Sequence, residues 1–270
     1  MTATSGMPGQ NGSTGRLHIA GLQISFGSRQ VVSIEDLRLD YAEILGLAGE
    51  SGSGKSMTTL AILGLAHTVG ATVSGSIALD GQELTGLSQE NLREIRGRRI
   101  AAIFQSPSTA FNPVYRVGTV VTKALRQHGA TKSEASDRAA EAMRQVLLSP
   151  DLMRRYPSQL SGGQLQRVAI ALAVALRAEI LLADEPTSAL DVTVQAEVLD
   201  LLRDLRASIG MSILFISHDL AVVAELCDQV AVMRRGMILE QGPASQVLSA
   251  PRHPYTAELL ESVPKLASAK

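Results

Sequence analysis

The sequence predicts an α/β fold with a mainly parallel core sheet, a small antiparallel β-subdomain and an inserted helical subdomain. Short, almost wholly apolar segments recur along the chain, and segments of helical periodicity separate them. A more polar, helical stretch follows residue 105. Apolar runs of about 4–8 residues are typical of parallel strands that are buried on both faces. A chain of 270 residues is long enough for one such domain with a subdomain.

The individual elements follow from these patterns. Five segments are predicted as parallel core strands: Ile44–Ala48, Ile100–Phe104, Ile180–Ala183, Ser212–Ile216 and Val230–Met233. Three segments are predicted as strands of the antiparallel sheet: Leu17–Phe26, Val31–Ile34 and Gly75–Leu79. Between Gln105 and Leu160 the pattern becomes helical, and Lys132–Leu148 is predicted to be an amphipathic helix.

Composition excludes several classes of protein. The formal net charge of −1 indicates no general attraction to nucleic acid, so no nucleic-acid partner is expected. The lone cysteine, Cys227, excludes an internal disulfide and a thiolate metal site, and is expected to be buried. Residues 1–15 are expected to be a disordered tail and not a signal peptide. No apolar stretch approaches the roughly 20 residues of a membrane span, so a soluble, cytoplasmic chain is expected.

The segment from Gly49 to Ser56 fits the P-loop pattern G-x-x-x-x-G-K-[ST]. It follows an apolar segment and precedes a helix-like run, which is the context that the motif requires. Glycines let backbone N–H groups approach phosphate oxygens, Lys55 is expected to reach the β- and γ-phosphates, and Ser56 is expected to bind Mg²⁺. The predicted nucleotide-binding residues here are Gly49, Glu50, Ser51, Gly52, Ser53, Gly54, Lys55, Ser56 and Met57.

Two carboxylates follow the apolar strand that begins at Ile180. Ligands bind at the carboxyl ends of strands in such sheets. Asp184 is the predicted Mg²⁺ ligand, because a hard cation prefers carboxylate oxygen. Glu185 is predicted to orient or deprotonate an attacking water.

A second glycine-bearing segment, Leu160–Gln164, opens a helix-like run. Taken alone, it would more often be an ordinary helix cap. Beside the P-loop it predicts a second anion site, formed by Ser161, Gly162, Gly163 and Gln164 at the positive end of the helix dipole. One nucleotide does not need two such sites, whereas two molecules placed head to tail would use both.

In combination, these motifs resemble the nucleotide-binding subunit of ABC transporters, and the resemblance runs from about Leu17 to the end of the chain. The P-loop, the LSGGQ signature and the Asp184–Glu185 pair match that family in order. Four further positions match as well, namely Phe26, Gln105 in Phe104–Pro107, Asp191 in Ser188–Asp191, and His218 in Ile216–Asp219.

The resemblance implies a P-loop NTPase of the ABC cassette type that binds and hydrolyses ATP with Mg²⁺. Gln105 would contact the Mg²⁺ and the water while sensing the membrane partner, and His218 would hydrogen-bond the γ-phosphate. Asp191 would bridge two cassettes, and Phe26 would stack on adenine, although the family's usual aromatic there is Tyr. The implied domains are the cassette at 16–250, its helical subdomain at about 106–165, and a C-terminal segment at 251–270.

The resemblance also implies partners. They are two integral membrane permease subunits, a second ABC ATPase subunit (this chain or a homologue) in a head-to-tail dimer, and a periplasmic or surface solute-binding protein. The chain would lie peripherally on the cytoplasmic face of the inner membrane.

Three segments, Ala110–Pro113, Arg155–Gly162 and Pro251–Thr256, resemble the dipeptide, oligopeptide and nickel importer branch of the family. Many peptide-type members carry a longer C-terminal extension, some with a cysteine cluster for an iron–sulfur centre. Because this chain ends at Lys270 and holds only Cys227, no iron–sulfur cluster is expected and nickel import is favoured. Dipeptide or oligopeptide import is the alternative. A soluble ABC ATPase outside transport and a P-loop small-molecule kinase stay open as other classes.

Overall fold

In the computed structural model, which describes residues 15–106 and 111–262, one ten-stranded sheet forms the centre of the molecule. Its strand order is β5-β4-β1-β2-β10-β9-β3-β8-β7-β6. The strands are β1 (Leu17–Phe26), β2 (Arg29–Leu39), β3 (Ile44–Ala48), β4 (Thr72–Leu79), β5 (Gln82–Glu83), β6 (Ile100–Ile103), β7 (Ile180–Asp184), β8 (Ser212–Ser217), β9 (Gln229–Arg234) and β10 (Met237–Pro243). The expected tail at residues 1–15 lies outside the described residues, apart from Gly15.

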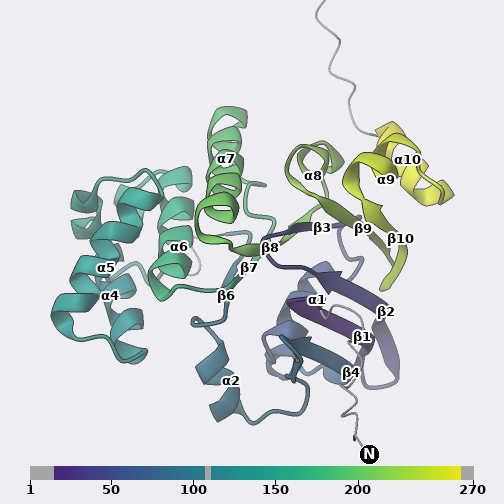
Figure 1. The fold of residues 1–270 in the computed structure, drawn as a ribbon, viewed down its shortest axis with the longest axis horizontal. Helices are drawn as coiled ribbons and strands as arrows, with labels where there is room; N and C mark the ends of the chain where they lie inside the picture. Colours follow the sequence, from purple (N-terminus) through teal and green to yellow (C-terminus); the bar gives the residue numbers. More distant parts are fainter. Residues whose placement is uncertain (1–14, 107–110, 263–270) are drawn as a thin grey trace, which may run out of the picture.

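Along the chain, helices connect many of these strands, and two helices follow the last strand (Figure 1). They are α1 (Lys55–Ile62), α2 (Gln89–Ile95), α4 (Val117–Gln127), α5 (Lys132–Gln145), α6 (Gly162–Leu176), α7 (Val192–Ile209), α8 (Leu220–Leu226), α9 (Ala244–Ser249) and α10 (Pro254–Ser262). Three short 3₁₀ helices lie at Ala66–Val69, Pro150–Arg154 and Pro157–Gln159.

All eight predicted strands are present, and two strands were not predicted. The two are the short β5 and β10, which pairs antiparallel with β9 and in parallel with β2 at Met237 and Ser33. β10 therefore joins the antiparallel strands to the parallel core as one sheet. Each of its residues is exposed or half-buried, so it differs from the fully buried, apolar core strands that were predicted.

The central strands β9, β3, β8, β7 and β6 are neighbours and run parallel to one another. Their carboxyl ends therefore lie along one edge of the sheet. The chain leaves this edge at the P-loop after β3, at Gln105 after β6, at Glu185 after β7 and at His218 after β8. Parallel pairing alone thus brings four predicted site segments together.

The continuous apolar character of these strands has a simple cause, because successive side chains face opposite sides of the sheet. Leu181 of β7 and Ile213 and Phe215 of β8 belong to one hydrophobic cluster. Leu182 of β7 and Leu214 of β8 belong to the other. Both faces are covered by apolar side chains, which explains why the strand interiors are apolar on both faces.

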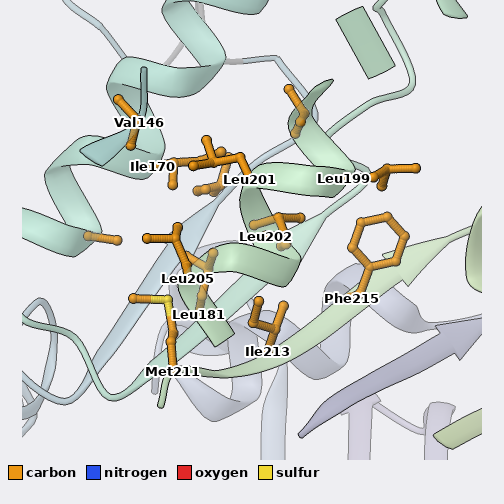
Figure 2. Close-up of a cluster of buried hydrophobic side chains, with 14 of the residues drawn as sticks. Val146, Ile170, Leu181, Leu199, Leu201, Leu202, Leu205, Met211, Ile213 and Phe215 are labelled. Carbon is orange, nitrogen blue, oxygen red and sulfur yellow. The ribbon is translucent and has the colours of Figure 1, made fainter. Parts of the chain in front are cut away.

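Figure 2 shows how α7 covers the first of these clusters. Leu202 and Leu205 of α7 point toward β8, and Leu199 lies near Phe215. Leu202 and Phe215 are fully buried. This packing fixes α7, whose first residue follows Asp191, against β8, which lies between β7 with Asp184 and β3 and is followed by His218.

Helices α4, α5 and α6 form the helical subdomain, which lies beside the sheet in Figure 1. A capping box between Thr131 and Glu134 starts α5 where the sequence predicts it. The helix ends at Gln145, three residues before the predicted Leu148. Leu147 adopts the left-handed conformation with φ of 58°, which the helix cannot continue through.

Candidate nucleotide site

The P-loop connects β3 to α1, as the motif requires. Gly52 and Gly54 adopt φ of 79° and 113°, a region that favours glycine. Gly49 is constrained by close packing, since a Cβ placed on it would lie 2.1 Å from the carbonyl oxygen of Met233. The first residues of α1 have no intrahelical partners for their N–H groups, so these can bind an anion.

Lys55 is held inside the loop. Its Nζ donates to the carbonyl oxygens of Gly49 at 2.6 Å and Glu50 at 2.8 Å, and its side chain is buried. Burial lowers the pKa of Lys55 below its ordinary value, while the carboxylates of Glu185 and Asp184 act in the opposite direction. The ammonium is thus oriented by backbone oxygens and lies in the field of the two carboxylates.

Asp184 is buried at the end of β7 and accepts a hydrogen bond from the Ser56 hydroxyl. Burial raises the pKa of Asp184, which the Ser56 hydrogen bond and the Lys55 charge partly offset. Two of the three predicted Mg²⁺ ligands are therefore in direct contact. A hydroxyl and a carboxylate are the hard oxygen donors that Mg²⁺ prefers.

Glu185 lies between Gln105 and His218. Its Oε2 accepts from Gln105 Nε2 at 2.9 Å, and its Oε1 lies 3.1 Å from His218 Nδ1. Glu185 adopts φ of 49°, an uncommon conformation for a non-glycine residue that is often associated with functional sites. Its backbone N–H donates to the carbonyl oxygen of Ile216 at 3.0 Å, which ties this turn to β8.

A cavity of about 390 Å³ brings together residues of the P-loop with Phe26, Gln105 and Glu185. It is lined by Phe26, Val31, Ser51, Gly52, Gly54, Lys55, Ser56, Met57, Gln105 and Glu185. Phe26 is 38% exposed at the end of β1, so its ring is accessible to a flat ligand. Val31 lines the cavity but was not among the predicted site residues. Its apolar strand position carries no signal that distinguishes it from a core residue.

The signature segment is not part of that cavity within the described residues. Ser161 caps α6 by accepting from the Gln164 N–H at 3.2 Å, and Gln164 Oε1 accepts from the Ser161 N–H in return. Ser161 and Gly162 are exposed, whereas Gly163 is buried. The signature segment is therefore an ordinary helix cap in its hydrogen bonds, and it is also an exposed helix N-terminus that an anion could reach.

The two signature glycines differ in what surrounds them. A Cβ on Gly163 would lie 2.2 Å from Val194 Cγ1 of α7, whereas a Cβ on Gly162 would meet nothing closer than Leu190 Cδ2 at 3.6 Å. Gly163 is therefore required for α6 to pack against α7, and Gly162 is not. Asp191 is also exposed and caps α7 by accepting from the Val194 N–H at 3.0 Å.

The chemistry of this site fits ATP with Mg²⁺. The loop offers backbone N–H groups and the Lys55 ammonium for phosphate oxygens, and Ser56, Asp184 and Gln105 offer oxygen ligands for the ion. When bound, the ion would neutralise the negative charge on the β- and γ-phosphates. Glu185 would hold the attacking water and accept its proton.

The comparisons agree with this chemistry. The family described as "ABC transporter" matches residues 31–188, which is more than half of the chain. The family described as "Oligopeptide/dipeptide transporter, C-terminal region" matches residues 239–270. The second match covers β10, α9 and α10, of which only the Pro251–Thr256 segment was singled out from the sequence.

Relatives cover almost the whole chain. The dipeptide transport ATP-binding protein DppD of Escherichia coli K12 is 42% identical over an alignment of 262 residues that covers 94% of this chain and 80% of that protein. A relative from Brucella melitensis is 44% identical over an alignment of 267 residues that covers 94% of this chain and 79% of that protein, and its name likewise refers to peptide import.

Solved structures share the fold. The dimeric ATP-binding cassette MJ0796, bound to ADP and Pi, has a TM-score of 0.72 and 25% identity over 84% of this chain and 98% of that one. The cbiO1 protein of Clostridium perfringens has a TM-score of 0.78 and 24% identity, covering 92% of this chain and all of that one. Among the described residues, no helix is both long and apolar enough to cross a membrane. The chain therefore belongs to the ABC transporter family, as an ATPase with the cassette fold that couples ATP hydrolysis to transport.

Proposed function

We propose that the chain is the ATP-hydrolysing subunit of an importer for dipeptides or oligopeptides. The observation that carries this proposal is the match of residues 239–270 to the C-terminal region of oligopeptide and dipeptide transporters. The 42% identity to a dipeptide transport ATP-binding protein supports it. The expectation of nickel import rests on where the chain ends, and the comparisons support the peptide alternative better.

The catalytic roles are part of the proposal. Lys55 and the P-loop amides bind the β- and γ-phosphates, and Ser56, Asp184 and Gln105 hold Mg²⁺. Glu185 is the general base, because its carboxylate is fixed by two neighbours at 2.9 and 3.1 Å. His218 contacts the γ-phosphate, and Phe26 stacks on adenine at the rim of the cavity.

A second ATPase subunit completes the site. Exposed Ser161 and Gly162 lie at the start of α6 and do not line the cavity that Lys55 lines. A partner placed head to tail would bring its signature over this P-loop and receive this signature over its own. Asp191 lies at the exposed start of α7, where it could bridge the two subunits.

The proposal also includes a contact surface for the membrane partners. Val114 and Tyr115 are 69% and 47% exposed and follow Gln105 by about ten residues. We place the contact with two membrane permease subunits here, so that Gln105 senses their state beside Glu185. A solute-binding protein would deliver the peptide, and the chain would act at the cytoplasmic face of the inner membrane.

Uptake measurements test the solute. Cells lacking the chain would receive a plasmid for the wild type, for Glu185→Gln, or for the control Glu225→Gln, which removes an exposed carboxylate that pairs with Arg203. The proposal predicts that labelled dipeptide uptake is restored by the wild type and the control but not by Glu185→Gln. Restoration of labelled nickel uptake alone would move the assignment to nickel, and no change in either would refute both solutes.

A further inference from the structure

The C-terminal helix α10 reaches the P-loop through one side chain. Tyr255 is 2% exposed, while its neighbour Pro254 is exposed. Its phenol oxygen accepts a hydrogen bond from the backbone N–H of Glu50 at 3.4 Å, across 205 residues of chain. Glu50 is the second residue of the P-loop. This contact connects the segment matched by the peptide-transporter region to the nucleotide site.

The peptide unit that Tyr255 contacts is the one that orients Lys55. The N–H of Glu50 and the carbonyl of Gly49 belong to the same planar peptide, in which the two bonds point in opposite directions and their dipoles add. Lys55 Nζ donates to that carbonyl at 2.6 Å, while Tyr255 accepts from that N–H. The peptide is therefore held from both sides, and each hydrogen bond polarises it in favour of the other.

Other contacts fix the Tyr255 ring. The guanidinium of Arg234, at the end of β9, lies 4.2 Å from the ring centroid. Burial raises the pKa of Tyr255 above its ordinary value, so the phenol keeps its proton at neutral pH. The turn after Arg234 contacts the loop as well, since Gly236 N–H donates to the Ser53 carbonyl at 2.8 Å.

The start of α10 is anchored to β10. The carboxylate of Glu240 accepts from the N–H groups of Arg252 at 2.8 Å and His253 at 3.0 Å. His253 Nδ1 in turn accepts from the backbone N–H of Tyr255 at 3.1 Å. The position of the Tyr255 hydroxyl is therefore set by strand β10 and not by α10 alone.

We propose that Tyr255 is a positioning residue for ATP binding, whose hydroxyl fixes the Gly49–Glu50 peptide and through it the Lys55 ammonium. The C-terminal segment is thus part of the support of the nucleotide site. This inference rests on the proposed nucleotide site but not on the identity of the solute. It also predicts that a partner that displaces α10 would weaken ATP binding.

The test compares three variants of the full chain with the wild type. Tyr255→Phe keeps the ring and removes the hydroxyl. Tyr41→Phe is a matched control that removes an exposed phenol hydroxyl, which hydrogen-bonds to Asp80 and does not line the cavity. Glu258→Gln is a second control, which changes an exposed side chain of the same helix as Tyr255. The Kd for the non-hydrolysable ATP analogue AMP-PNP with Mg²⁺ is measured by calorimetry, KM and kcat for ATP by steady-state hydrolysis, and Tm by thermal unfolding.

Tyr255→Phe removes one long, neutral hydrogen bond. We therefore expect Kd and KM to rise roughly 2- to 5-fold in this variant, with kcat nearly unchanged. Both control variants are expected to retain the wild-type Kd whatever their effect on Tm. An unchanged Kd for Tyr255→Phe, or an equal rise in both controls, would overturn the role of the hydroxyl. Failure of the wild type itself to bind AMP-PNP would instead refute the nucleotide site.

Discussion

The different surroundings of the two signature glycines make a prediction about stability. We predict that Gly163→Ala destabilises the folded chain and that Gly162→Ala does not. The added Cβ at residue 163 would lie 2.2 Å from Val194 Cγ1. Two apolar carbon atoms attract each other most strongly at a separation of about 3.5–4.0 Å. Helices α6 and α7 must therefore separate or Val194 must leave its rotamer.

The size of the effect follows from two opposing contributions. Overpacking of this kind costs about 1–3 kcal/mol, and replacing glycine by alanine in a helix returns up to about 1 kcal/mol. A contact as short as 2.2 Å places the overpacking cost in the upper part of its range, at about 2–3 kcal/mol. The expected net loss is therefore about 1–2 kcal/mol, which lowers Tm by about 2–8 °C for a chain of this size. Gly162→Ala gains the helix contribution without the clash, so its Tm should equal or slightly exceed that of the wild type.

Thermal unfolding of the isolated chain, followed by far-UV circular dichroism, measures both variants. The Val194→Ala change supplies a matched rescue, because it removes the methyl that the new Cβ would meet. The double variant Gly163→Ala with Val194→Ala should recover most of the Tm lost in the single glycine variant. A Gly163→Ala variant as stable as the wild type would refute the packing argument, and an absence of rescue would place the strain elsewhere.

Three other predictions concern the assembled site and the C-terminal segment. Ser161→Arg should leave AMP-PNP binding by the isolated chain intact and abolish hydrolysis in the assembled pair; full hydrolysis would argue against a composite site. Asp191→Ala should lower stability by about 1 kcal/mol, because it removes the cap of α7, whereas Asp191→Asn keeps the cap; equal unfolding curves for the two would contradict this. Glu240→Gln should lower Tm at pH 7. The pKa of Glu240 is below its ordinary value of 4.5, since hydrogen bonds from two backbone N–H groups outweigh the effect of burial. A carboxyl with a lowered folded pKa stabilises above its unfolded pKa and ceases to do so as pH falls through the folded value, so the Tm difference should vanish in acid. A difference independent of pH would contradict this assignment.

The parallel core was predictable because burial on both faces requires continuous apolar strands. β3, β7 and β8 are entirely buried, and β3 has the predicted limits. The antiparallel strand β10 was not predictable in this way, because its residues are partly exposed and gain their pairing from β9 and β2. Local pattern carries no information about a partner strand that is distant in the sequence.

The site residues that lie at the ends of the core strands were predictable from the sequence. Asp184, Glu185 and His218 lie where their apolar strands stop, and the P-loop carries its own glycine pattern. The contact of Tyr255 with the P-loop was not predictable, since it joins residues 205 positions apart through one hydroxyl. The segments Phe104–Pro107 and Ala110–Pro113 extend into residues outside those that the structure describes.

The Glu185→Gln variant tests the central claim most directly. Gln keeps the size of the side chain and its ability to hydrogen-bond Gln105 and His218, but it cannot accept the proton of the attacking water. Single-turnover hydrolysis of bound ATP should fall by about 10²- to 10⁴-fold while the Kd for AMP-PNP stays unchanged. Hydrolysis at the wild-type rate in this variant would contradict the assignment of Glu185 as the base and, with it, the proposed mechanism.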